Sequence, residues 1–331
     1  MTSKQAEEIR VVHVDPDGFG EVDTERREFE AALPGVRFDS IAVGDDELAD
    51  RVGPADVLLT HYTRVDRAAL DAISPRVIVR YATGVDGIDL DEATRRGIAV
   101  INIPTYCDDE VADHVIASGL SLLRGLPQYN ADCARGGWNW RLVAPPSRIA
   151  DCTFGFLGFG RKAQAAAARA RALGCRILAH DPHQPDEAFE REGAQAVDFD
   201  TLLRESRLLS LHAPLTPETE GMIDARALAL LPAGAVLINT ARGLIVDEAA
   251  LADALDRGHL MGAALDVLSE EPPPADHPLL GRDNVIVTPH SAWYSTQAER
   301  LVRERGSHYA LAALRGEDSP GLYNKESLAR R

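Results

Sequence analysis

Three polar side chains follow apolar runs that are typical of buried β-strands. Arg242 follows VLINTA, Glu271 follows GAALDVLSE, and His290 follows VIVTP. The carboxyl ends of parallel strands are where open α/β sheets bind ligands. Taken singly, such an Arg is usually a solvated charge, such a Glu is usually loop surface, and a lone His is usually structural. Together the three form a candidate catalytic set.

An arginine, a carboxylate and a histidine supply what carbonyl reduction needs. Hydride delivered to the C2 carbon of a 2-keto acid leaves an alkoxide that must be protonated, and an imidazole suits that task. A neighbouring carboxylate, Glu271, would orient the ring of His290 and favour its charged form. Arg242 can bind a substrate carboxylate with its forked guanidinium and polarise the keto oxygen. We therefore expect His290 to act as general acid and base.

The hydride would come from a nicotinamide, and a second motif predicts its site. Residues 155–163, GFLGFGRKA, close an apolar strand and open an Ala-rich helix in the pattern G-x-G-x-x-A. Gly158 permits a tight turn, Gly160 lets the backbone approach a pyrophosphate, and Ala163 allows close helix packing. Asp181 ends the next strand, where a carboxylate would accept from ribose hydroxyls and repel a 2′-phosphate, favouring NAD over NADP. The alternative is a glycine turn followed by an ordinary strand-ending Asp.

Alternating apolar strands and helical stretches position these groups. One series of β-branched runs begins at residue 9 and comprises IRVVHV, RFDSIAV, ADVLLT, RVIVRYA and IAVINI. A second series begins at Cys152 and comprises CTFGFLG, CRILAHD, RLLSLHA, GAVLINT, GAALDV and NVIVTPH. Such alternation predicts parallel α/β structure. A chain of 331 residues fits two domains of this kind.

The segment between the two series predicts a long helix, because its apolar positions from Val111 through Leu123 suit one. Acidic residues and a histidine gather near its start and could be mistaken for a metal cluster. We interpret them as residues that a helix N-terminus favours through its dipole, so that no metal is expected: Asp108, Asp109, Glu110, Asp113 and His114.

Residues 125–148 are rich in Gly, Trp, Pro and Arg and predict an extended excursion. Trp138, Trp140 and the Pro145-Pro146 pair do not fit a regular element. We expect an arm that contacts a second subunit, because large aromatic residues in such segments often fill interfaces. Packing within the chain is the alternative.

Charge and cysteine usage narrow the classes of partner. The chain has 35 Lys and Arg against 52 Asp and Glu, a formal net charge of -17, so its average field repels nucleic acid and anionic lipid. The N-terminus, MTSKQAEEIR, has no apolar leader segment, and no run is long enough to span a bilayer. A cytoplasmic protein is expected. The cysteines lack metal-like spacing and predict reduced thiols: Cys107, Cys133, Cys152 and Cys175.

At the candidate site the chain resembles the D-isomer-specific 2-hydroxyacid dehydrogenase family. NTARGLIVDEAAL, GAALDVLSEEP and NVIVTPH look like the family's signatures around its catalytic Arg, Glu and His, and VRYATGVDGIDL resembles its substrate-carboxylate loop. The likeness covers roughly residues 55 to 330, and four ordered motifs are more specific than one short pattern. HSAWYS and GLYNKESL look most like the C-terminal-binding-protein branch and its bacterial dehydrogenase relatives, beside a phosphoglycerate-dehydrogenase-like branch.

The resemblance implies an NAD-dependent oxidoreductase that interconverts a small 2-keto acid and its D-2-hydroxy acid. Arg242, Glu271 and His290 become its catalytic residues. The backbone N–H groups of the Ala82-Thr83-Gly84 turn become donors to the substrate carboxylate, and other residues would line the pocket: Arg80, His61 and Trp293. The residues implied to contact NAD are Gly158, Gly160, Arg161, Lys162, Asp181, His212, Ala213, Pro214, Thr240, Ala241, Arg242, Asp266 and His290.

The chain departs from the family pattern in places. Ala82 stands where many members carry Gly, Gly87 stands where Asn is common, and Ala163 replaces the last fingerprint Gly. Val115 occupies a helix position where relatives often place a hydroxyl near the nicotinamide. The methyl group of Ala82 lies beside the carboxylate loop, so it bears on substrate identity rather than on reaction type.

The family's architecture implies two Rossmann- or flavodoxin-like parallel-sheet domains with the active site in the cleft between them. Residues 1–103 and 294–331 would form a discontinuous substrate-binding domain, and residues 104–293 would form the NAD-binding domain. Pro104 and Ala292 would lie near the hinges. A homodimer joined through the NAD-binding domains is also implied.

Two other functions would keep this fold. An NAD(H)-sensing interaction protein of the C-terminal-binding-protein type needs the nucleotide site but no acid catalyst, so the presence of Arg242, Glu271 and His290 together favours an enzyme. A dehydrogenase acting on phosphite or a phosphonate would use its arginines to bind an oxyanion that is not a carboxylate. The sequence leaves that substrate class open.

Overall fold

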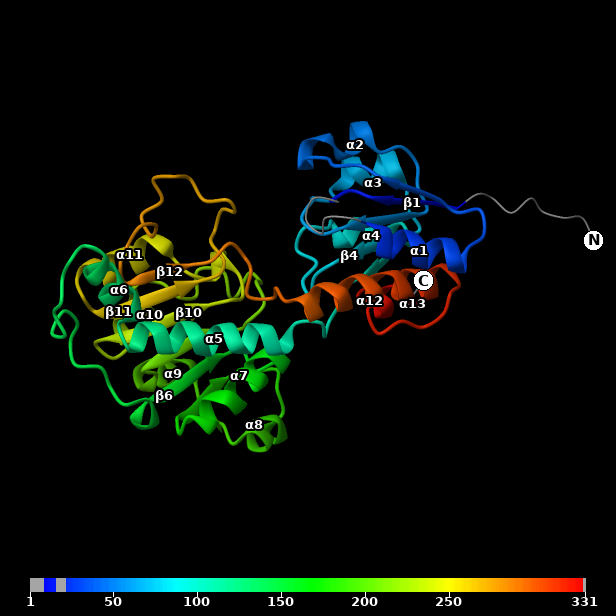
Figure 1. The fold of residues 1–331 in the computed structure, drawn as a ribbon. Helices are drawn as coiled ribbons and strands as arrows, with labels where there is room; N and C mark the ends of the chain where they lie inside the picture. The colour runs from blue at the N-terminus through cyan, green and yellow to red at the C-terminus, as the bar shows by residue number, and fades with distance from the viewer. Residues whose placement is uncertain (1–8, 16–21, 330–331) are drawn as a thin grey trace, which may run out of the picture. The chain divides into compact units, whose positions relative to one another are not determined.

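The chain divides into two compact units, each built around one parallel sheet (Figure 1). The computed structural model describes residues 9–15 and 22–329. The first unit extends to Tyr106 and resumes at Ser295, and the second runs from Cys107 to Tyr294. The expected boundaries, after residues 103 and 293, thus lie close to those of the two units, after residues 106 and 294. The first unit is discontinuous because its last helices come from the far end of the chain.

The first unit contains a five-stranded sheet in the order β2-β1-β3-β4-β5, which is the flavodoxin-like order. Its strands coincide with the first series of apolar runs: β1 (Arg10–His13), β2 (Arg37–Ser40), β3 (Val57–Thr60), β4 (Val77–Arg80) and β5 (Ala99–Ile101). β3 and β4 read as continuous apolar runs because helices cover both of their faces.

Two sets of helices cover this sheet. α1 (Asp23–Ala32) packs against α12 (Thr296–Leu314), which lies on β4 and β5. The opposite face buries Val12, Leu58 and Ile78 in a core shared with three further helices: α2 (Leu48–Arg51), α3 (Arg67–Ile73) and α4 (Leu90–Arg95). The short helices η2 (Asp45–Glu47) and α13 (Lys325–Ala329) complete the described part of this unit.

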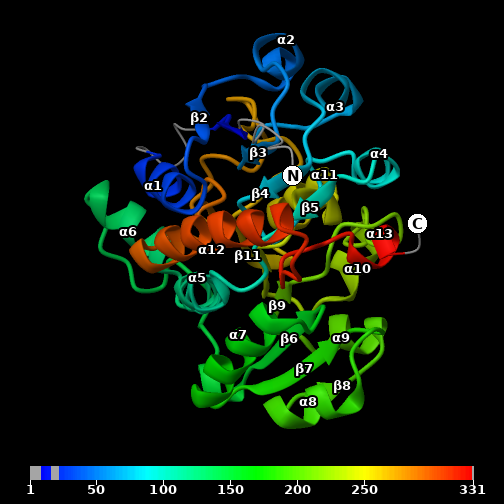
Figure 2. The ribbon, with the colours of Figure 1, turned by 90° about the vertical axis from the view of Figure 1, so that its right-hand side faces the viewer.

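The second unit contains a seven-stranded sheet in the order β12-β11-β10-β9-β6-β7-β8. Numbered from β6, the order is the doubly wound arrangement that binds dinucleotides, with one strand added. Its strands are β6 (Thr153–Leu157), β7 (Arg176–His180), β8 (Gln195–Ala196), β9 (Leu208–Leu211), β10 (Ala235–Asn239), β11 (Leu260–Leu265) and β12 (Val285–Val287). The sequence pattern predicts all of these except β8, an exposed edge strand of two residues (Figure 2).

Helices cover both faces of the second sheet as well. On one face α5 (Asp108–Leu123) packs against α7 (Arg161–Ala172). An added Cβ at Gly119 of α5 would lie 3.0 Å from the side chains of Leu208 and Ile238, so this glycine permits close packing on the sheet. The alternate residue Leu209 points into the core on the other side, under α9 (Phe199–Glu205), α10 (Ala225–Leu230) and α11 (Glu248–Asp256). Further helices of this unit are α8 (Asp186–Glu192), η3 (Ile149–Asp151) and η4 (Gly243–Ile245).

The segment at residues 125–148 differs from the expected extended excursion. α6 (Leu126–Ala134) is a regular helix, so the prediction of irregular structure is wrong for this part. The helix gives no apolar stripe to recognise because none of its residues is buried. Residues 135–148 contain neither helix nor strand, as predicted, and Trp138 and Trp140 lie in this part.

Two smaller expectations, the long helix and the free thiols, are confirmed. The long helix α5 begins at Asp108, and its first turn contains Asp108, Asp109 and Glu110. All four cysteines are free thiols. Separately, none of the helices within the described ranges has the length and hydropathy needed to cross a membrane.

Candidate active site

The candidate site residues of the second unit follow the carboxyl ends of its strands. Because the strands are parallel, these ends share one edge of the sheet. The residues that follow β6, β7, β9, β10, β11 and β12 are, in that order, Gly158, Asp181, His212, Arg242, Asp266 and His290. The fold therefore places the nucleotide motif and the proposed catalytic set at the same edge.

His290 and Glu271 form a hydrogen-bonded pair. The Nδ1 atom of His290 lies 2.8 Å from Oε2 of Glu271, and the other oxygen of Glu271 accepts the Leu268 N–H at 3.2 Å. Burial alone would raise the pKa of Glu271, but the hydrogen bond and charge of His290, with Leu268 and Arg242, hold it below the ordinary value. The carboxylate is therefore ionised near neutral pH. It accepts from Nδ1 and leaves Nε2 as the nitrogen that can exchange a proton.

A buried carboxylate shapes the turn that carries His290. Asp266, which is 3% exposed, accepts the N–H groups of Ser291 at 2.8 Å and Ala292 at 3.0 Å, and the Thr288 hydroxyl at 2.6 Å. His290 has a φ of 51°, a left-handed conformation uncommon for a residue with a side chain. Strain of this kind persists only where surrounding contacts hold it. Asp266, which the resemblance implies as a cofactor contact, thus orients the His290 turn in this structure.

The loop that carries Arg242 is held by a buried amide. The side chain of Asn239, 1% exposed, donates to the Arg242 carbonyl at 2.9 Å and accepts the Ala241 N–H at 3.0 Å. The guanidinium of Arg242 donates to the Ala241 carbonyl at 2.6 Å. Sequence reasoning missed Asn239, although an amide at the end of an apolar strand, three residues before the predicted arginine, is a signal that could have found it.

Gly243 brings the arginine loop against the glutamate loop. A Cβ built on Gly243 would lie 1.9 Å from the carbonyl carbon of Leu268 and 2.3 Å from the amide nitrogen of Ser269. Backbone atoms cannot yield as a flexible side chain can, so only glycine fits here. The close approach connects Arg242 to the segment that ends at Glu271.

The glycine loop has the form that a dinucleotide requires. Gly158 has a φ of 83°, and a Cβ there would lie 2.6 Å from the backbone nitrogen of Ala213. Gly160 caps α7 and has open space where its Cβ would be, so a phosphate group can approach the helix N-terminus. Ala163 is fully buried, as close helix packing demands. Arg161 and Lys162 lie 3.3 and 3.4 Å from Asp108 of α5.

Asp181 is attached to the same glycine loop. Its Oδ2 accepts the Phe159 N–H at 2.7 Å, and its Oδ1 accepts the His183 N–H at 2.9 Å. A carboxylate has about four acceptor positions, so this geometry leaves capacity for ribose hydroxyls. Asp181 therefore both orders the turn and presents a negative charge beside it.

Other predicted cofactor residues add polar groups at this edge. His212 lies 2.8 Å from the Ser210 hydroxyl, and burial, with the charge of Lys162, lowers its pKa to about 3. His212 is therefore neutral and can hydrogen-bond but not act as a proton donor of the imidazolium type. The hydroxyl oxygen of Thr240 is shielded and has no hydrogen-bond partner among the described residues. An unsatisfied buried hydroxyl next to this loop fits a bound ligand.

In the first unit, Asp15 orders the loop after β3. Its carboxylate accepts from the Thr60 hydroxyl at 2.8 Å, the His61 N–H at 2.6 Å and the Thr63 N–H at 3.1 Å. Burial would raise the pKa of Asp15, but the hydrogen bonds from Thr63, His61 and Thr60 hold it below its ordinary value. Sequence reasoning missed Asp15, although an acidic residue ends the apolar run VVHVD. His61 is 4% exposed, so little of it could reach a substrate.

The proposed carboxylate loop follows β4. The Ala82 N–H donates to the Arg80 carbonyl at 2.8 Å, so this donor is already engaged. The proposed donors to the substrate carboxylate are then the other N–H groups of the turn. Arg80 donates to the Thr63 carbonyl at 3.2 Å. A Cβ on Gly87 would lie 3.1 Å from the Arg80 guanidinium, so Gly87, where Asn is common in the family, leaves room for this arginine. Trp293 of the second unit packs edge-on against Tyr294, with ring centroids 5.4 Å apart.

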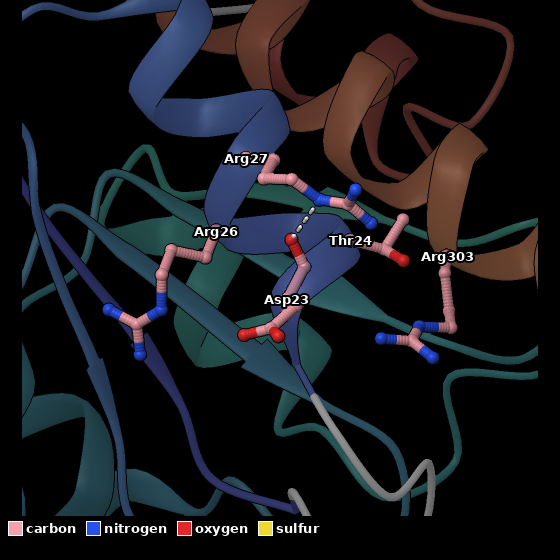
Figure 3. Close-up of a pocket in the computed structure, with 5 residues that line it drawn as sticks. All are labelled: Asp23, Thr24, Arg26, Arg27 and Arg303. Atoms are coloured by element: carbon pink, nitrogen blue, oxygen red, sulfur yellow. Dashed lines mark hydrogen bonds between the residues drawn. The ribbon is translucent and has the colours of Figure 1, made fainter.

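A different set of residues lines a hollow in the first unit (Figure 3). It is lined by Asp23, Thr24, Arg26, Arg27 and Arg303. Its charged groups bond with their neighbours: Arg303 pairs with buried Glu25 at 2.8 Å, and Arg27 donates to the Asp23 carbonyl at 3.1 Å. The first of these contacts joins α12 to α1 and the second lies within α1, so we regard the hollow as part of the helix packing.

The acidic residues at the start of α5 form ion pairs. Arg169 of α7 lies 2.6 Å from Asp113 and 2.8 Å from Asp109. Within the described ranges, no group of three or more potential ligands could hold a metal ion. These carboxylates therefore join α5 to α7.

Comparison with known proteins identifies what the chain is similar to. The family model for the D-isomer specific 2-hydroxyacid dehydrogenase NAD binding domain matches residues 116–292. The glyoxylate reductase of Thermococcus litoralis is 39% identical over 289 residues, which are 85% of this chain and 87% of that protein. The D-3-phosphoglycerate dehydrogenase of Methanocaldococcus jannaschii is 36% identical over 286 residues, 86% of this chain but 54% of that protein, so the chain spans about half of its length.

The fold also matches solved structures. The crystal structure of the D-lactate dehydrogenase from Aquifex aeolicus, complexed with NAD and lactic acid, aligns with a TM-score of 0.80 at 27% identity. The alignment covers 93% of this chain and 96% of that one.

Proposed function

The chain belongs to the D-isomer-specific 2-hydroxyacid dehydrogenase family, and we propose that it uses His290, Glu271 and Arg242 to interconvert a small 2-keto acid and its D-2-hydroxy acid. Membership makes it an NAD-dependent oxidoreductase. The observation that carries the assignment of residues is the 2.8 Å contact between His290 and Glu271, on the same sheet edge as the glycine loop.

His290 handles the proton of the reaction. When bound, the reduced cofactor supplies the hydride that C2 of the keto acid accepts. Nε2 of His290 donates a proton to the keto oxygen, which becomes the hydroxyl group, and takes it back in the reverse direction. Glu271 holds the ring through Nδ1 and stabilises the imidazolium form.

Arg242 binds the substrate. Its guanidinium can bond the carboxylate through two N–H groups, and its charge stabilises the oxygen on which negative charge develops. The buried Asn239 amide and Gly243 hold the backbone on either side of Arg242, so the loop is ordered before a ligand arrives. Such preorganisation lowers the barrier more than a mobile arginine could.

The cofactor contacts follow from the glycine loop. The N-terminus of α7 and the backbone at Gly158 and Gly160 are suited to the pyrophosphate. Asp181 is suited to the ribose, and the neutral His212 and the Thr240 hydroxyl offer hydrogen bonds at the same edge. We propose that the other residues predicted from the sequence also contact NAD: Arg161, Lys162, Ala213, Pro214, Ala241 and Asp266.

Asp181→Asn is expected to weaken discrimination against NADPH. The amide oxygen can still accept the Phe159 N–H, so the turn persists, but the charge that repels a 2′-phosphate is lost. Because a hydrogen bond to a charged group contributes about 1.5–3 kcal/mol, the NADH-to-NADPH ratio of kcat/KM should fall on the order of tenfold or more. Asp186→Asn, an exposed carboxylate on α8, is the control. An unchanged ratio would remove Asp181 from cofactor selection.

A panel of 2-keto acids tests the function itself. Purified protein with NADH would be mixed with glyoxylate, pyruvate, hydroxypyruvate, branched and aromatic keto acids and phosphonopyruvate, following absorbance of the reduced cofactor. We expect turnover of a small keto acid, since the similar proteins are a glyoxylate reductase and a D-lactate dehydrogenase. Tight NADH binding without any turnover would favour the sensing protein. Turnover of phosphonopyruvate alone, or NADH formation when phosphite is mixed with NAD in a separate assay, would favour the phosphonate alternative.

We propose that the first unit recognises the rest of the substrate. Its proposed pocket residues are Thr83 and Gly84 of the carboxylate turn, Arg80 and the largely buried His61. Trp293 is a proposed pocket residue of the second unit. The ordering of the neighbouring loop by Asp15 supports this role, because preformed loops bind small anions with less entropic cost.

A homodimer through the second unit is the proposed assembly. α6 buries none of its residues, and the segment after it exposes Trp138 by 92% and Trp140 by 75%. The double change Trp138→Ser and Trp140→Ser is expected to shift the mass measured by light scattering from twice the chain mass to one chain, because large aromatics concentrate interface energy. Tyr323→Ser, an exposed aromatic in the first unit, is the control. A double variant that stays dimeric would place the interface elsewhere.

A further inference from the structure

Glu248 makes a dense set of contacts to the loop that carries Glu271. Glu248 is the first residue of α11, and its side chain is 13% exposed. Its Oε1 accepts the Ser269 N–H at 2.7 Å, and its Oε2 accepts the Ser269 hydroxyl at 2.6 Å. Oε2 also lies 3.1 Å from Nε2 of His277. One carboxylate thus fixes two points of this loop.

His277 is itself fixed. Its Nδ1 accepts the Leu279 N–H at 3.4 Å, which leaves Nε2 as the donor to Glu248. Leu279 is fully buried in the core of the second unit, so it fixes one end of the loop. The residues between Ser269 and Asp276 are almost all exposed and have little packing of their own. Glu248 therefore supplies much of the order of this segment.

The same short stretch also contacts the arginine loop. Gly243 touches the backbone of Leu268 and Ser269 so closely that no Cβ would fit. Two residues beyond Ser269 comes Glu271, which bonds His290 with one oxygen and the Leu268 N–H with the other. Residues 243–248 thus contact the loop that carries Glu271, the hydrogen-bond partner of His290.

We propose that Glu248 is a positioning residue that holds Glu271 against His290 through Ser269 and His277. The proposal rests on the function proposed above, since it concerns the same site. It adds a residue that touches none of the proposed catalytic groups directly. The carboxylate fits this role because both of its oxygens accept hydrogen bonds at once, which a neutral side chain cannot reproduce.

Glu248→Ala, Glu248→Gln and Ser269→Ala test this role against the parent enzyme. Since misplacing a catalytic group by about 1 Å can cost a hundredfold, Glu248→Ala should lower kcat on the order of tenfold or more, with KM for NADH unchanged. The kcat of Glu248→Gln should lie between those of Glu248→Ala and the parent, because its one amide oxygen can still accept a hydrogen bond from Ser269. Glu205→Gln is the matched control, a carboxylate of the same unit that pairs with Arg176 at 2.6 Å.

The pH dependence separates positioning from simple stability. Contacts place Glu271, Arg242, Asp266 and His114 around the His290 turn. If Glu271 moves away, the imidazolium loses its carboxylate, and the alkaline limb of kcat/KM for keto-acid reduction should shift to lower pH. A merely structural role would lower Tm and leave both kcat and that limb as in the parent, which would overturn the proposal. Ser269→Ala and Glu248→Gln provide the same readouts if Glu248→Ala does not fold.

A crystal structure of Glu248→Gln or Glu248→Ala gives a result that does not depend on turnover. We expect the distance from Glu271 Oε2 to His290 Nδ1 to exceed hydrogen-bond range, above about 3.5 Å. An unchanged pair, as in the parent at 2.8 Å, would overturn the role of Glu248. Absence of keto-acid turnover by the parent would instead overturn the proposed function, so the two failures are distinguishable.

Discussion

His290→Gln is expected to lower kcat/KM for keto-acid reduction by on the order of a hundredfold or more, because the alkoxide loses its proton donor. The glutamine amide can still bond Glu271, so the loop should persist. Steady-state assays with NADH and the best substrate of the panel measure the effect, and direct titration of NADH separates a loss of proton transfer from a loss of cofactor binding.

His308→Gln is the control for this change. His308 is an exposed histidine of α12 that lies 3.5 Å from Glu28, so it matches the chemistry of the substitution outside the site. Equal kcat/KM values for His290→Gln and the parent would remove His290 from the chemistry.

Arg242→Ala is expected to lower kcat/KM by a similar factor, about a hundredfold or more, since it removes charge where the transition state develops it. The substrate KM should rise as well, because the same guanidinium binds the carboxylate. Arg242→Lys retains a positive charge but not the fork, so it should recover only part of the loss.

Arg257→Ala provides the control for the arginine. Arg257 caps the end of α11 and pairs with Asp253 at 2.5 Å on the surface. An Arg242→Ala variant with the kcat and KM of this control would show that Arg242 neither binds substrate nor stabilises the developing charge.

The sheets could be predicted because their strands are covered on both faces. Runs such as VLLT in β3 and AVLIN in β10 are apolar throughout, and that pattern depends on burial alone. β8 and α6 could not be predicted, because neither has a buried residue to mark it. The sequence pattern therefore revealed the strands whose residues are buried and missed the elements whose residues are exposed to solvent.

The candidate site could be predicted as residue types but not as a network. Arg242, Glu271 and His290 were recognisable because each interrupts or follows an apolar strand. Asn239 holds the Arg242 loop through local contacts that its place at the end of a strand could have suggested. Glu248, which we propose to position Glu271, is an ordinary polar residue in the sequence, and its role depends on contacts between loops. Only the folded loops bring Glu248 to Ser269, a residue 21 positions away.

A crystal structure with NADH and an unreactive 2-keto acid analogue tests the central claim most directly. We expect Nε2 of His290 within about 2.6–3.2 Å of the oxygen that replaces the keto oxygen, with the Arg242 guanidinium on the analogue's carboxylate. An analogue bound beside the nicotinamide while both His290 and Arg242 point away from it would contradict this account.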